Sequence, residues 1–418
     1  MRFLHTADWH LGRTIRGRSR QGEFEVVLSE LVDIARQEQV EAMLVCGDIF
    51  DSTSPSPDAE HLLNDTLREC VGLGIQVVLL AGNHDNPRRL EALGRISDLL
   101  GVFVQSTVRA PDDGGVITLH GAEHVARIAA VPWIREGHII DAAALFGSEH
   151  DARIQTYADA AGGVLRALCR DFTPETVNIL AAHVFIDGAQ LANLDGSERL
   201  LHVGQAYGVN PAALPSSPQY LALGHIHQPQ ELRGAPAPAA YSGSLLQLDF
   251  GERGQQKVVR IIDAAPGLPI QQRPVPLTSG RPLLEVRGTL AEVARAAEGA
   301  PGAHLRVVLD VERPEPGMAQ RVRDLLPGAV DVRLQYERLA EDLEEPTLGR
   351  LAPVDLFARY YRSQHGVEPS TELIALFTEL LAGETREVAG GAPVPVAAPL
   401  PLPAAVPAGR SAQAEVEA

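Results

Sequence analysis

The stretch IQVVLLAGNHD, residues 75–85, decides the fold. Its first seven residues are nearly all apolar and include β-branched side chains, which predicts a buried strand. The strand ends abruptly in Gly82, Asn83, His84 and Asp85, and the last three of these can bind a metal ion or move a proton. Asn and Asp are also favoured in ordinary turns, so the segment by itself leaves a turn and a functional site equally open.

The residues before this segment predict the sheet that contains it. Residues 2–6 and 40–46 are typical of buried strands, and apolar residues recur at helical spacing over residues 22–37. Residues 58–71, which follow two prolines, form a second predicted helix. A strand-helix-strand-helix-strand order favours a sheet that is covered by helices.

Five of the predicted strands end in side chains that can bind metal. A lone Asp-x-His or His-x-His more often belongs to a loop or a surface, but α/β folds gather their sites at the carboxyl ends of strands. Five such endings together therefore indicate one site. Its candidate residues are Asp8 and His10, Asp48, Asn83 with His84, His183, and His225 with His227.

The later strands require a second sheet, so the predicted fold class is α/β. We expect a two-sheet sandwich flanked by helices over residues 1–265. The remaining segments are a proline-rich connector at 266–282, a small β-α-β-α-β domain at 283–340, C-terminal helices at 341–382 and a disordered Pro/Ala-rich tail at 383–418.

Composition excludes several classes of protein. The 418 residues are 45% hydrophobic, which indicates a globular protein with two or three domains. No apolar run is long enough to span a bilayer, and the N-terminus lacks a signal-peptide pattern, so we expect a cytoplasmic location without membrane attachment. Three widely spaced cysteines argue against a disulfide framework or a zinc cluster.

The charge of the chain is unfavourable for a polyanionic substrate. The net charge is −18, so nucleic acid would be repelled unless basic residues are concentrated or metal ions offset the field. One concentration exists, because Arg13, Arg16, Arg18 and Arg20 follow one another without an acid between them. We expect these arginines to contact phosphate groups.

The ligand types indicate the metal and the reaction. Carboxylate, amide and imidazole groups without thiolate suit manganese or iron, while magnesium, zinc or another divalent ion would also be accepted. Apart from His84, the seven candidates are too many for one ion and suit two, with Asp48 as the candidate bridge. A pair of ions about 3.5–4 Å apart is the arrangement that hydrolyses phosphoesters.

The motifs resemble those of the calcineurin-like metallophosphoesterases. The matching segments are Asp8-x-His10, Gly47-Asp48-x-x-Asp51, Gly82-Asn83-His84-Asp85, His183 and Gly224-His225-x-His227. Within this superfamily, residues 4–12, LHTADWHLG, and 222–227, ALGHIH, are similar to the SbcD family, the nuclease subunits of SbcCD complexes. The likeness covers residues 1–382.

The resemblance implies roles for the site residues. Asp8, His10, Asp48 and His227 would hold one Mn²⁺, and Asp48, Asn83, His183 and His225 the other. His84 would face the scissile phosphate, with Asp85 positioned behind it, so these two are the candidate catalytic residues.

The resemblance also implies an activity and partners. The activity would be a 3′-to-5′ exonuclease on duplex DNA ends and an endonuclease on single strands or hairpins. Two copies would pair through the helices at 58–71 and 88–100, and the C-terminal helices would bind an SbcC-type ATPase, giving a homodimer within a heterotetramer. The domain at 283–340 would be a cap that presents DNA.

Two alternatives stay open at this point. One is another calcineurin-like enzyme that acts on small phosphoesters or phosphoproteins. Against the phosphoprotein version, Ser52 stands where protein phosphatases continue with Arg-Gly, and Asp85 stands where they carry Glu. The other is a non-catalytic subunit that tethers DNA and uses the site only for binding or structure.

Overall fold

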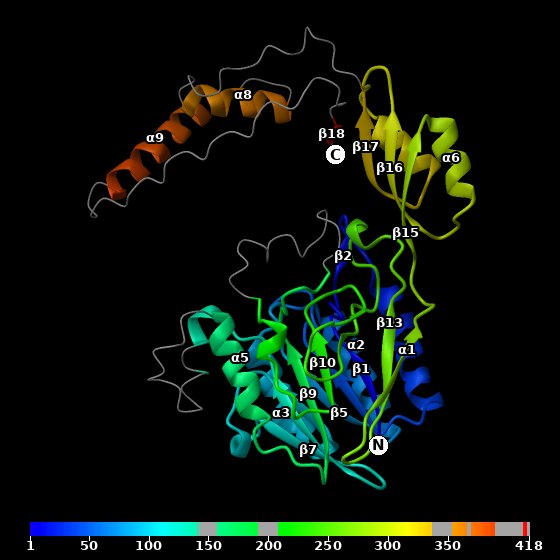
Figure 1. The fold of residues 1–418 in the computed structure, drawn as a ribbon. Coiled ribbons are helices and arrows are strands. Elements are labelled where there is room, and N and C mark those ends of the chain that lie inside the picture. Colours follow the sequence, from blue (N-terminus) through cyan, green and yellow to red (C-terminus); the bar gives the residue numbers. More distant parts are fainter. Residues whose placement is uncertain are drawn as a thin grey trace. The chain divides into compact units, whose positions relative to one another are not determined.

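The computed structural model describes residues 1–139, 142, 157–190, 208–336, 353–365, 369–388 and 413–415 (Figure 1). The chain divides into two compact units. The first consists of residues 1–310, 315–334 and 415–418, and the second of residues 311–314 and 335–414.

The first unit contains two six-stranded sheets. The first sheet has the order β14-β13-β1-β4-β5-β6, in which β1, β4, β5 and β6 are parallel. Strands β13 and β14 pair antiparallel at its other edge. Its strands are β1 (Arg2–Thr6), β4 (Ala42–Val45), β5 (Gln76–Leu80), β6 (Val102–Gln105), β13 (Val258–Asp263) and β14 (Gln271–Pro276).

The second sheet has the order β11-β12-β10-β9-β8-β7. Strands β8, β9, β10 and β12 are parallel, and an antiparallel strand lies at each edge. Its strands are β7 (Val116–His120), β8 (Val125–Val131), β9 (Val177–His183), β10 (Tyr220–Gly224), β11 (Gln230–Glu231) and β12 (Ala239–Tyr241).

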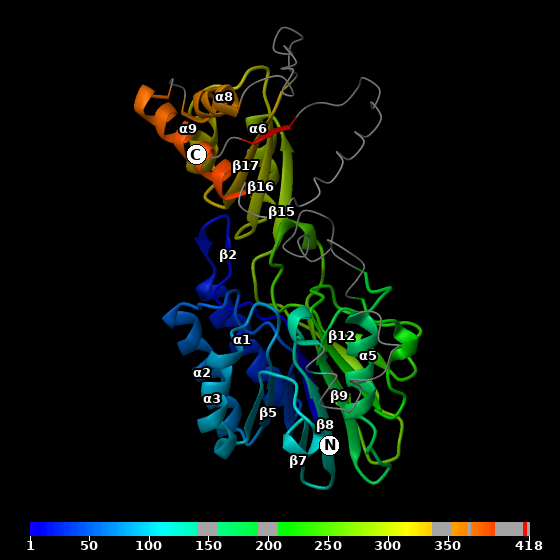
Figure 2. The same cartoon turned by 90° about the vertical axis from the view of Figure 1, so that its left-hand side faces the viewer.

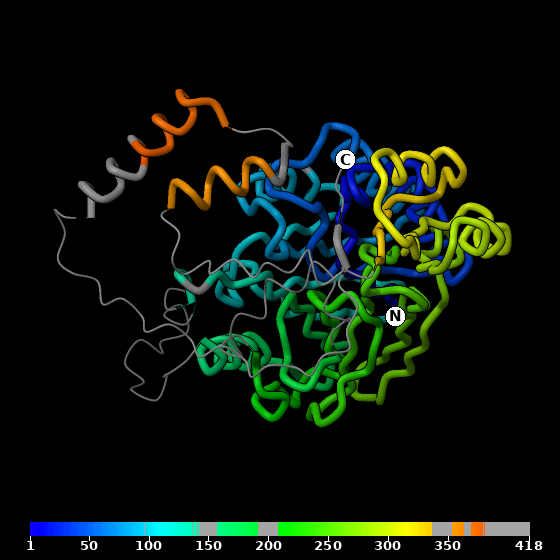
Figure 3. The backbone as a smooth tube through the Cα atoms, turned by 90° about the horizontal axis from the view of Figure 1, so that it is seen from above, coloured from blue at the N-terminus to red at the C-terminus, as the bar shows by residue number. Residues whose placement is uncertain are grey.

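Alternation of side chains along the strands builds the layers. In β4, Leu44 joins the core between the two sheets, whereas Met43 and Val45 join the core on the helical side. The central strands β4, β9 and β10 are buried on both faces, which explains the continuous apolar runs in the sequence. Figure 2 shows the helices and sheets edge-on, and Figure 3 shows the N-terminal half and the second half of this unit side by side. The two-sheet sandwich is confirmed.

The outer layers are helical. Helices α1 (Gln21–Gln37), α2 (Pro57–Gly72) and α3 (Pro87–Ser97) cover the first sheet, and α5 (Tyr157–Leu168) covers the second. Short 3-10 turns connect several elements, and one of them, η7 (Phe250–Glu252), lies close to the site described below.

The predicted connector is wrong in one part. Strand β14 lies inside residues 266–282 and pairs along the whole of β13, so the sandwich continues past residue 265. Pro274 and Pro276 favour a loop when the sequence is considered alone. Because β14 is the edge strand of its sheet, a proline that donates no hydrogen bond is tolerated there.

The small domain has the predicted order of elements. Its strands and helices are β15 (Leu283–Gly288), α6 (Leu290–Glu298), β16 (His304–Asp310), α7 (Met318–Leu325) and β17 (Ala329–Gln335). A capping box at Thr289 and Glu292 begins α6. We refer to this part of the first unit as the cap.

The second unit contains helices α8 (Pro353–His365) and α9 (Thr371–Val388). The ring of Phe357 stacks on that of Phe377 with the centroids 4.1 Å apart, so the two helices pack together. Helix α9 continues past residue 383, the predicted start of the tail, because residues 383–388 include the helix formers Glu and Arg. A short strand, β18 (Gln413–Glu415), lies within that predicted tail, most of which is outside the described residues. No helix in the described part of the chain is both long and apolar enough to cross a membrane.

Candidate active site

The candidate site is formed by loops that follow five parallel strands. Four of its residues, Asp8, His10, Asp48 and His225, have positive φ angles of 53°, 48°, 49° and 102°. Non-glycine residues rarely adopt this conformation, which costs of order 1–3 kcal/mol and is typical of functional sites. The backbone strain therefore coincides with residues that sequence motifs selected independently.

Hydrogen bonds between the loops stabilise these strained turns. The amide of Asp8 donates to the carbonyl of Gly47 at 3.0 Å, and that of His10 donates to the carbonyl of Asp48 at 3.0 Å. The amide of His225 donates to the carboxylate of Asp8 at 3.0 Å. Loops that follow β1, β4 and β10 are thus tied together through backbone groups and the carboxylate of Asp8.

Two glycines in the motifs are required for close packing. A Cβ atom on Gly82 would lie 2.0 Å from Oδ1 of Asp48. A Cβ atom on Gly47, which has a φ of +90°, would lie 2.1 Å from Nδ1 of His183. Both distances are far below van der Waals contact, so glycine at these positions lets the ligand-bearing loops approach one another.

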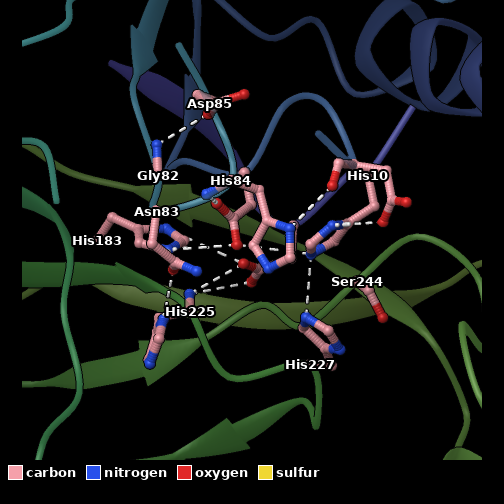
Figure 4. Close-up of polar contacts among 12 residues, drawn as sticks. His10, Gly82, Asn83, His84, Asp85, His183, His225, His227 and Ser244 are labelled. Carbon is pink, nitrogen blue, oxygen red and sulfur yellow. Dashed lines mark hydrogen bonds and ion pairs between the residues drawn. The ribbon is translucent and has the colours of Figure 1, made fainter. Parts of the chain in front are cut away.

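One group of candidate ligands consists of Asp8, His10 and His227. Their ligand atoms lie within 4.8 Å of one another, and all three residues are buried. The Nε2 atoms of His10 and His227 are 3.1 Å apart. Figure 4 shows both rings on one side of the site.

A second group lies on the other side and consists of Asn83, His183 and His225 (Figure 4). Oδ1 of Asn83 is 3.1 Å from Nε2 of His183 and 3.0 Å from Nδ1 of His225. Nδ1 of His183 lies 2.8 Å from the carbonyl oxygen of Cys46. If Nδ1 carries the proton and donates it there, Nε2 is left as the ligand atom.

Asp48 lies between the two groups. Its Oδ2 atom is 3.5 Å from Nε2 of His10 and 3.5 Å from Nε2 of His183. This is the position expected of a bridging carboxylate. Asp8 also belongs to groups on both sides, because its ligand atom lies within 4.8 Å of those of Asp48 and His183. The geometry therefore allows either carboxylate to bridge.

Burial and mutual charge set the protonation of the site. Burial raises the pKa of Asp8 to about 7, whereas it lowers the pKa of His10 to about 4. Burial also opposes ionisation of Asp48 and His183, but the attraction between them is stronger. It holds the pKa of Asp48 well below its usual range and raises that of His183 to about 9. A buried pocket that holds such carboxylates and imidazoles suits divalent cations.

His84 lies in the middle of the site (Figure 4). Its amide donates to Oδ1 of Asp48 at 2.9 Å, and its Nδ1 atom is 2.9 Å from the carbonyl oxygen of Asp51. Nε2 is therefore the ring nitrogen left for chemistry. His84 also forms a group with His10 and Asp48 that is close enough to share an ion, so its geometry allows a ligand role as well.

Asp85 clamps two loops together. Its carboxylate is fully buried and accepts hydrogen bonds from the amides of Gly82 at 2.8 Å, Ile49 at 3.1 Å and Phe50 at 2.9 Å. The family resemblance implies a position behind His84 and a part in catalysis. These three hydrogen bonds hold the loop after β5 against the loop after β4.

Two buried residues at the site carry no sequence motif. Nδ1 of His227 lies 2.9 Å from Oε1 of Glu252 in η7, and Nζ of Lys257 lies 2.7 Å from Oε2 of the same carboxylate. Lys257 is the only lysine in the chain, and this is the one signal that the sequence offers. Trp133 also has no motif, although its ring stacks on that of His225 with the centroids 5.0 Å apart.

The arginine cluster differs from expectation. Arg20 is 1% exposed and pairs with Glu23, so it is not available to DNA. Arg13 pairs with Asp51 at 3.0 Å beside the site. The other two arginines, Arg16 and Arg18, lie in the hairpin of β2 (Thr14–Ile15) and β3 (Arg18–Ser19), which extends towards the cap.

Both of these arginines contact the cap. Arg16 pairs with Asp331 at 3.2 Å, and Arg18 donates to the carbonyl oxygens of Pro327 and Ala329. The residues that looked like a phosphate-binding loop therefore connect the sandwich to the cap.

Comparisons with known proteins agree with the fold and with the motifs. The model of the calcineurin-like phosphoesterase family matches residues 1–229. The model described as type 5 capsule protein repressor C-terminal domain matches residues 279–365. Among solved structures, a dimetal phosphatase from Danio rerio covers 67% of this chain and 99% of its own at 14% identity, but its TM-score of 0.37 is too low to bear on function.

Three curated relatives are named as the SbcD component of the nuclease SbcCD. The protein of Bacillus subtilis is 32% identical and covers 93% of this chain and 99% of its own. That of Rhodobacter capsulatus is 32% identical over 75% of this chain and 81% of its own. That of Escherichia coli K12 is 28% identical over 86% of this chain and 92% of its own. The chain therefore belongs to the SbcD family of nuclease subunits within the calcineurin-like phosphoesterases, and it is a metal-dependent phosphodiesterase.

Proposed function

We propose that this chain is the manganese-dependent DNA nuclease subunit of an SbcCD-type complex in the cytoplasm. It would degrade duplex ends from 3′ to 5′ and cut single strands and hairpins, in DNA end processing, repair and recombination. The observation that carries the proposal is the convergence of six ligand-forming side chains around Asp48 in a chain whose relatives are named as SbcCD nuclease subunits.

Two divalent ions fit this arrangement of donors. Asp8, His10 and His227 would hold one ion and Asn83, His183 and His225 the other, with Asp48 as the bridge. Such a pair of ions supplies a water of lowered pKa and holds the phosphate oxygens. Oxygen and imidazole donors without thiolate suit Mn²⁺, and Mg²⁺ would bind less well to the imidazoles.

His84 would act on the phosphate. Because Nδ1 faces the carbonyl oxygen of Asp51, Nε2 is free to stabilise the developing charge or to protonate the leaving sugar oxygen. Most candidate ligands around His84 are buried, and a low local dielectric constant would strengthen this interaction. Asp85 would contribute by keeping the loop that carries His84 in place.

Exposed apolar side chains on the second unit favour an ATPase partner. On α8 and α9, Tyr360 is 64% exposed, Leu376 53% and Leu380 63%. Exposed apolar side chains along a helix pair are typical of a surface that binds another protein. We propose that they bind the coiled-coil base of an SbcC-type ATPase, and that α2 and α3 pair two copies into a homodimer within a heterotetramer.

Cleavage assays on the full chain test the proposal. With Mn²⁺, alone and with its ATPase partner, it should shorten duplex DNA and open hairpins, and His84→Ala should abolish both activities. Manganese binding by His84→Ala, measured by calorimetry, separates the two roles of this residue: two retained ions favour a role at the phosphate, and one favours a ligand. Intact DNA together with rapid hydrolysis of bis-p-nitrophenyl phosphate would instead indicate an enzyme for small phosphoesters.

A further inference from the structure

A cavity of about 760 Å³ adjoins the candidate metal centre. Ala81 and Gly82, which precede the ligand Asn83, form part of its wall, so the cavity begins where the metal ligands end. Its volume is in the range of small-molecule sites, about 300–1,000 Å³. Its described lining contains no candidate metal ligand and no candidate catalytic residue.

The charge of the cavity is opposite to that of the chain. Arg88, Arg135 and His138 line it, and its described lining contains no carboxylate. Arg88 and Arg135 are exposed, and neither guanidinium forms an ion pair or hydrogen bond with a residue that the structure describes. In a protein of net charge −18, two such arginines beside a phosphodiesterase centre indicate an anionic ligand.

The cavity also has a buried polar group without a partner. Ser106 lines the cavity and is 3% exposed, and its hydroxyl forms no hydrogen bond within the described residues. Buried hydroxyls are nearly always hydrogen-bonded, and leaving one unpaired costs about 1–3 kcal/mol. The hydroxyl oxygen is itself covered by protein atoms, so it is part of the packing of the cavity wall and does not identify the ligand.

An aromatic ring joins the cavity to the metal centre. Trp133 lines the cavity, and its ring stacks on that of His225 at 5.0 Å with an interplanar angle of 21°. Pro87, Val108 and Ile134 add apolar surface around it. Apolar and aromatic walls with arginines nearby match a nucleotide, which combines a flat base with a phosphate.

We propose that this cavity binds one unpaired nucleotide next to the scissile phosphodiester. Trp133 and the apolar wall contact the base, and Arg88 and Arg135 contact the flanking phosphates. The proposal rests on the DNA nuclease function proposed above. A base inside a duplex is stacked on its neighbours and cannot enter such a cavity, so the end of a duplex must fray first, at a cost of a few kcal/mol per base.

The cavity thereby gives the chain a substrate preference. Single strands, hairpin loops and frayed ends supply an unpaired nucleotide without this cost, so they should be cut faster than blunt duplex ends. The cavity also explains how a chain of negative net charge holds DNA, because the phosphate contacts lie in the cavity rather than in the hairpin of β2 and β3.

The test uses Arg88→Ala/Arg135→Ala in the full chain with Mn²⁺. We expect the KM for a single-stranded oligonucleotide to rise at least about tenfold, because charge-assisted contacts to the phosphates are removed. Hydrolysis of bis-p-nitrophenyl phosphate should stay unchanged. The matched control is Arg36→Ala, which removes a surface arginine in the last turn of α1 that pairs with Asp33, and it should change neither reaction.

A second arm tests the base. In wild type, an abasic residue beside the cleaved bond should raise KM, and in Trp133→Ala the same abasic residue should have no further effect. If the double arginine variant also weakens inhibition by deoxyadenosine monophosphate, the cavity holds the released nucleotide. If that inhibition is unchanged, it holds the uncleaved flanking one.

An unchanged KM for single-stranded DNA in the double variant would overturn the proposal and leave the nuclease function intact. An equal loss of both reactions would also overturn it, because the arginines would then support the metal centre itself. Failure of the wild type to cut DNA at all is a different result and would reject the nuclease function instead.

Discussion

His227 and Glu252 form a buried pair in which Nδ1 of the imidazole lies 2.9 Å from Oε1 of the carboxylate. Burial opposes ionisation of Glu252, but the charge of Lys257 and the contact with His227 outweigh it and lower the pKa of Glu252 well below its usual range. An ionised Glu252 fixes the proton of His227 on Nδ1, so that Nε2 faces His10. The orientation of this candidate ligand is therefore set by a residue from η7, on a different loop.

Replacing Glu252 should weaken metal binding. Loss of a carboxylate that orients a ligating histidine typically costs 10–100-fold in affinity, so Glu252→Gln should retain one tightly bound Mn²⁺ and lose most of the second. Isothermal titration calorimetry measures this directly. Glu298→Gln, an exposed carboxyl at the end of α6, is the control. Two ions bound with unchanged affinity in Glu252→Gln would show that His227 is oriented without this carboxylate.

Asp85 and Asp8 should respond in opposite ways to loss of charge. Burial raises the pKa of Asp85 to about 6, but both of its oxygens accept backbone hydrogen bonds, three in all, and the single oxygen of Asn cannot replace them. Asp85→Asn should therefore lower the free energy of unfolding by about 2–4 kcal/mol, with or without metal. Burial raises the pKa of Asp8 to about 7, so Asp8→Asn should leave the metal-free protein equally stable or more stable while abolishing phosphodiester hydrolysis.

Urea unfolding in EDTA, paired with hydrolysis assays, distinguishes these variants. Asp112→Asn, in an exposed 3-10 turn, is the control for both. Equal destabilisation by Asp85→Asn and Asp8→Asn would contradict the assignment of Asp85 as the clamp between two loops.

Glu23 should make the junction between sandwich and cap sensitive to acid. Its carboxylate is 2.7 Å from Nε2 of His304 in the cap and 2.8 Å from Nη2 of Arg20. Burial favours the neutral acid, but these partners outweigh it and lower the pKa of Glu23 to about 2. Because the folded pKa is below the ordinary value of 4.5, the stabilisation is complete above about pH 4.5 and is lost as the pH falls towards about 2.

The measurement is the difference in unfolding free energy between wild type and Glu23→Gln. It should be about 1–2 kcal/mol at pH 7 and should shrink steadily below pH 4.5. Glu25→Gln, an exposed neighbour on α1, should show no such trend. A difference that stays constant down to about pH 3 would mean that the charge of Glu23 does not hold the junction.

The polar ends of the predicted strands and the helical spacing of apolar residues predicted most of the fold and the position of the site. The two-sheet sandwich follows from apolar runs that each end in a polar loop, and the convergence of Asn83, His183 and His225 follows from the rule that such loops meet at one edge of the sheets. These features depend on local patterns, and local patterns are what a single sequence displays.

Other features depend on which distant segments meet, and the sequence does not display that. Arg20 looked like a phosphate ligand because it lies near other arginines, yet the fold buries its guanidinium between Glu23 and the carbonyl oxygen of Gln247, which is far away in the sequence. Glu252 had no motif because its partner His227 lies on another loop. The prolines of β14 concealed an edge strand, since the place of a strand in its sheet is a tertiary property.

Gly82 offers a test of how tightly the site is packed. A Cβ at this position would lie 2.0 Å from Oδ1 and 2.2 Å from the amide nitrogen of Asp48, so the candidate bridging carboxylate must move. Gly82→Ala should lower the free energy of unfolding by about 1–3 kcal/mol. It should also weaken Mn²⁺ binding at both positions at once, because Asp48 lies between the two ligand groups.

Calorimetry with Mn²⁺ and urea unfolding measure the two effects of Gly82→Ala separately. Gly163→Ala in α5 is the matched control, since its added Cβ meets no atom within 4 Å, and it should stabilise the helix by up to about 1 kcal/mol. Loss of only one ion in Gly82→Ala would contradict the bridge, because a displaced Asp48 would then serve a single metal position and Asp8 would have to join the two.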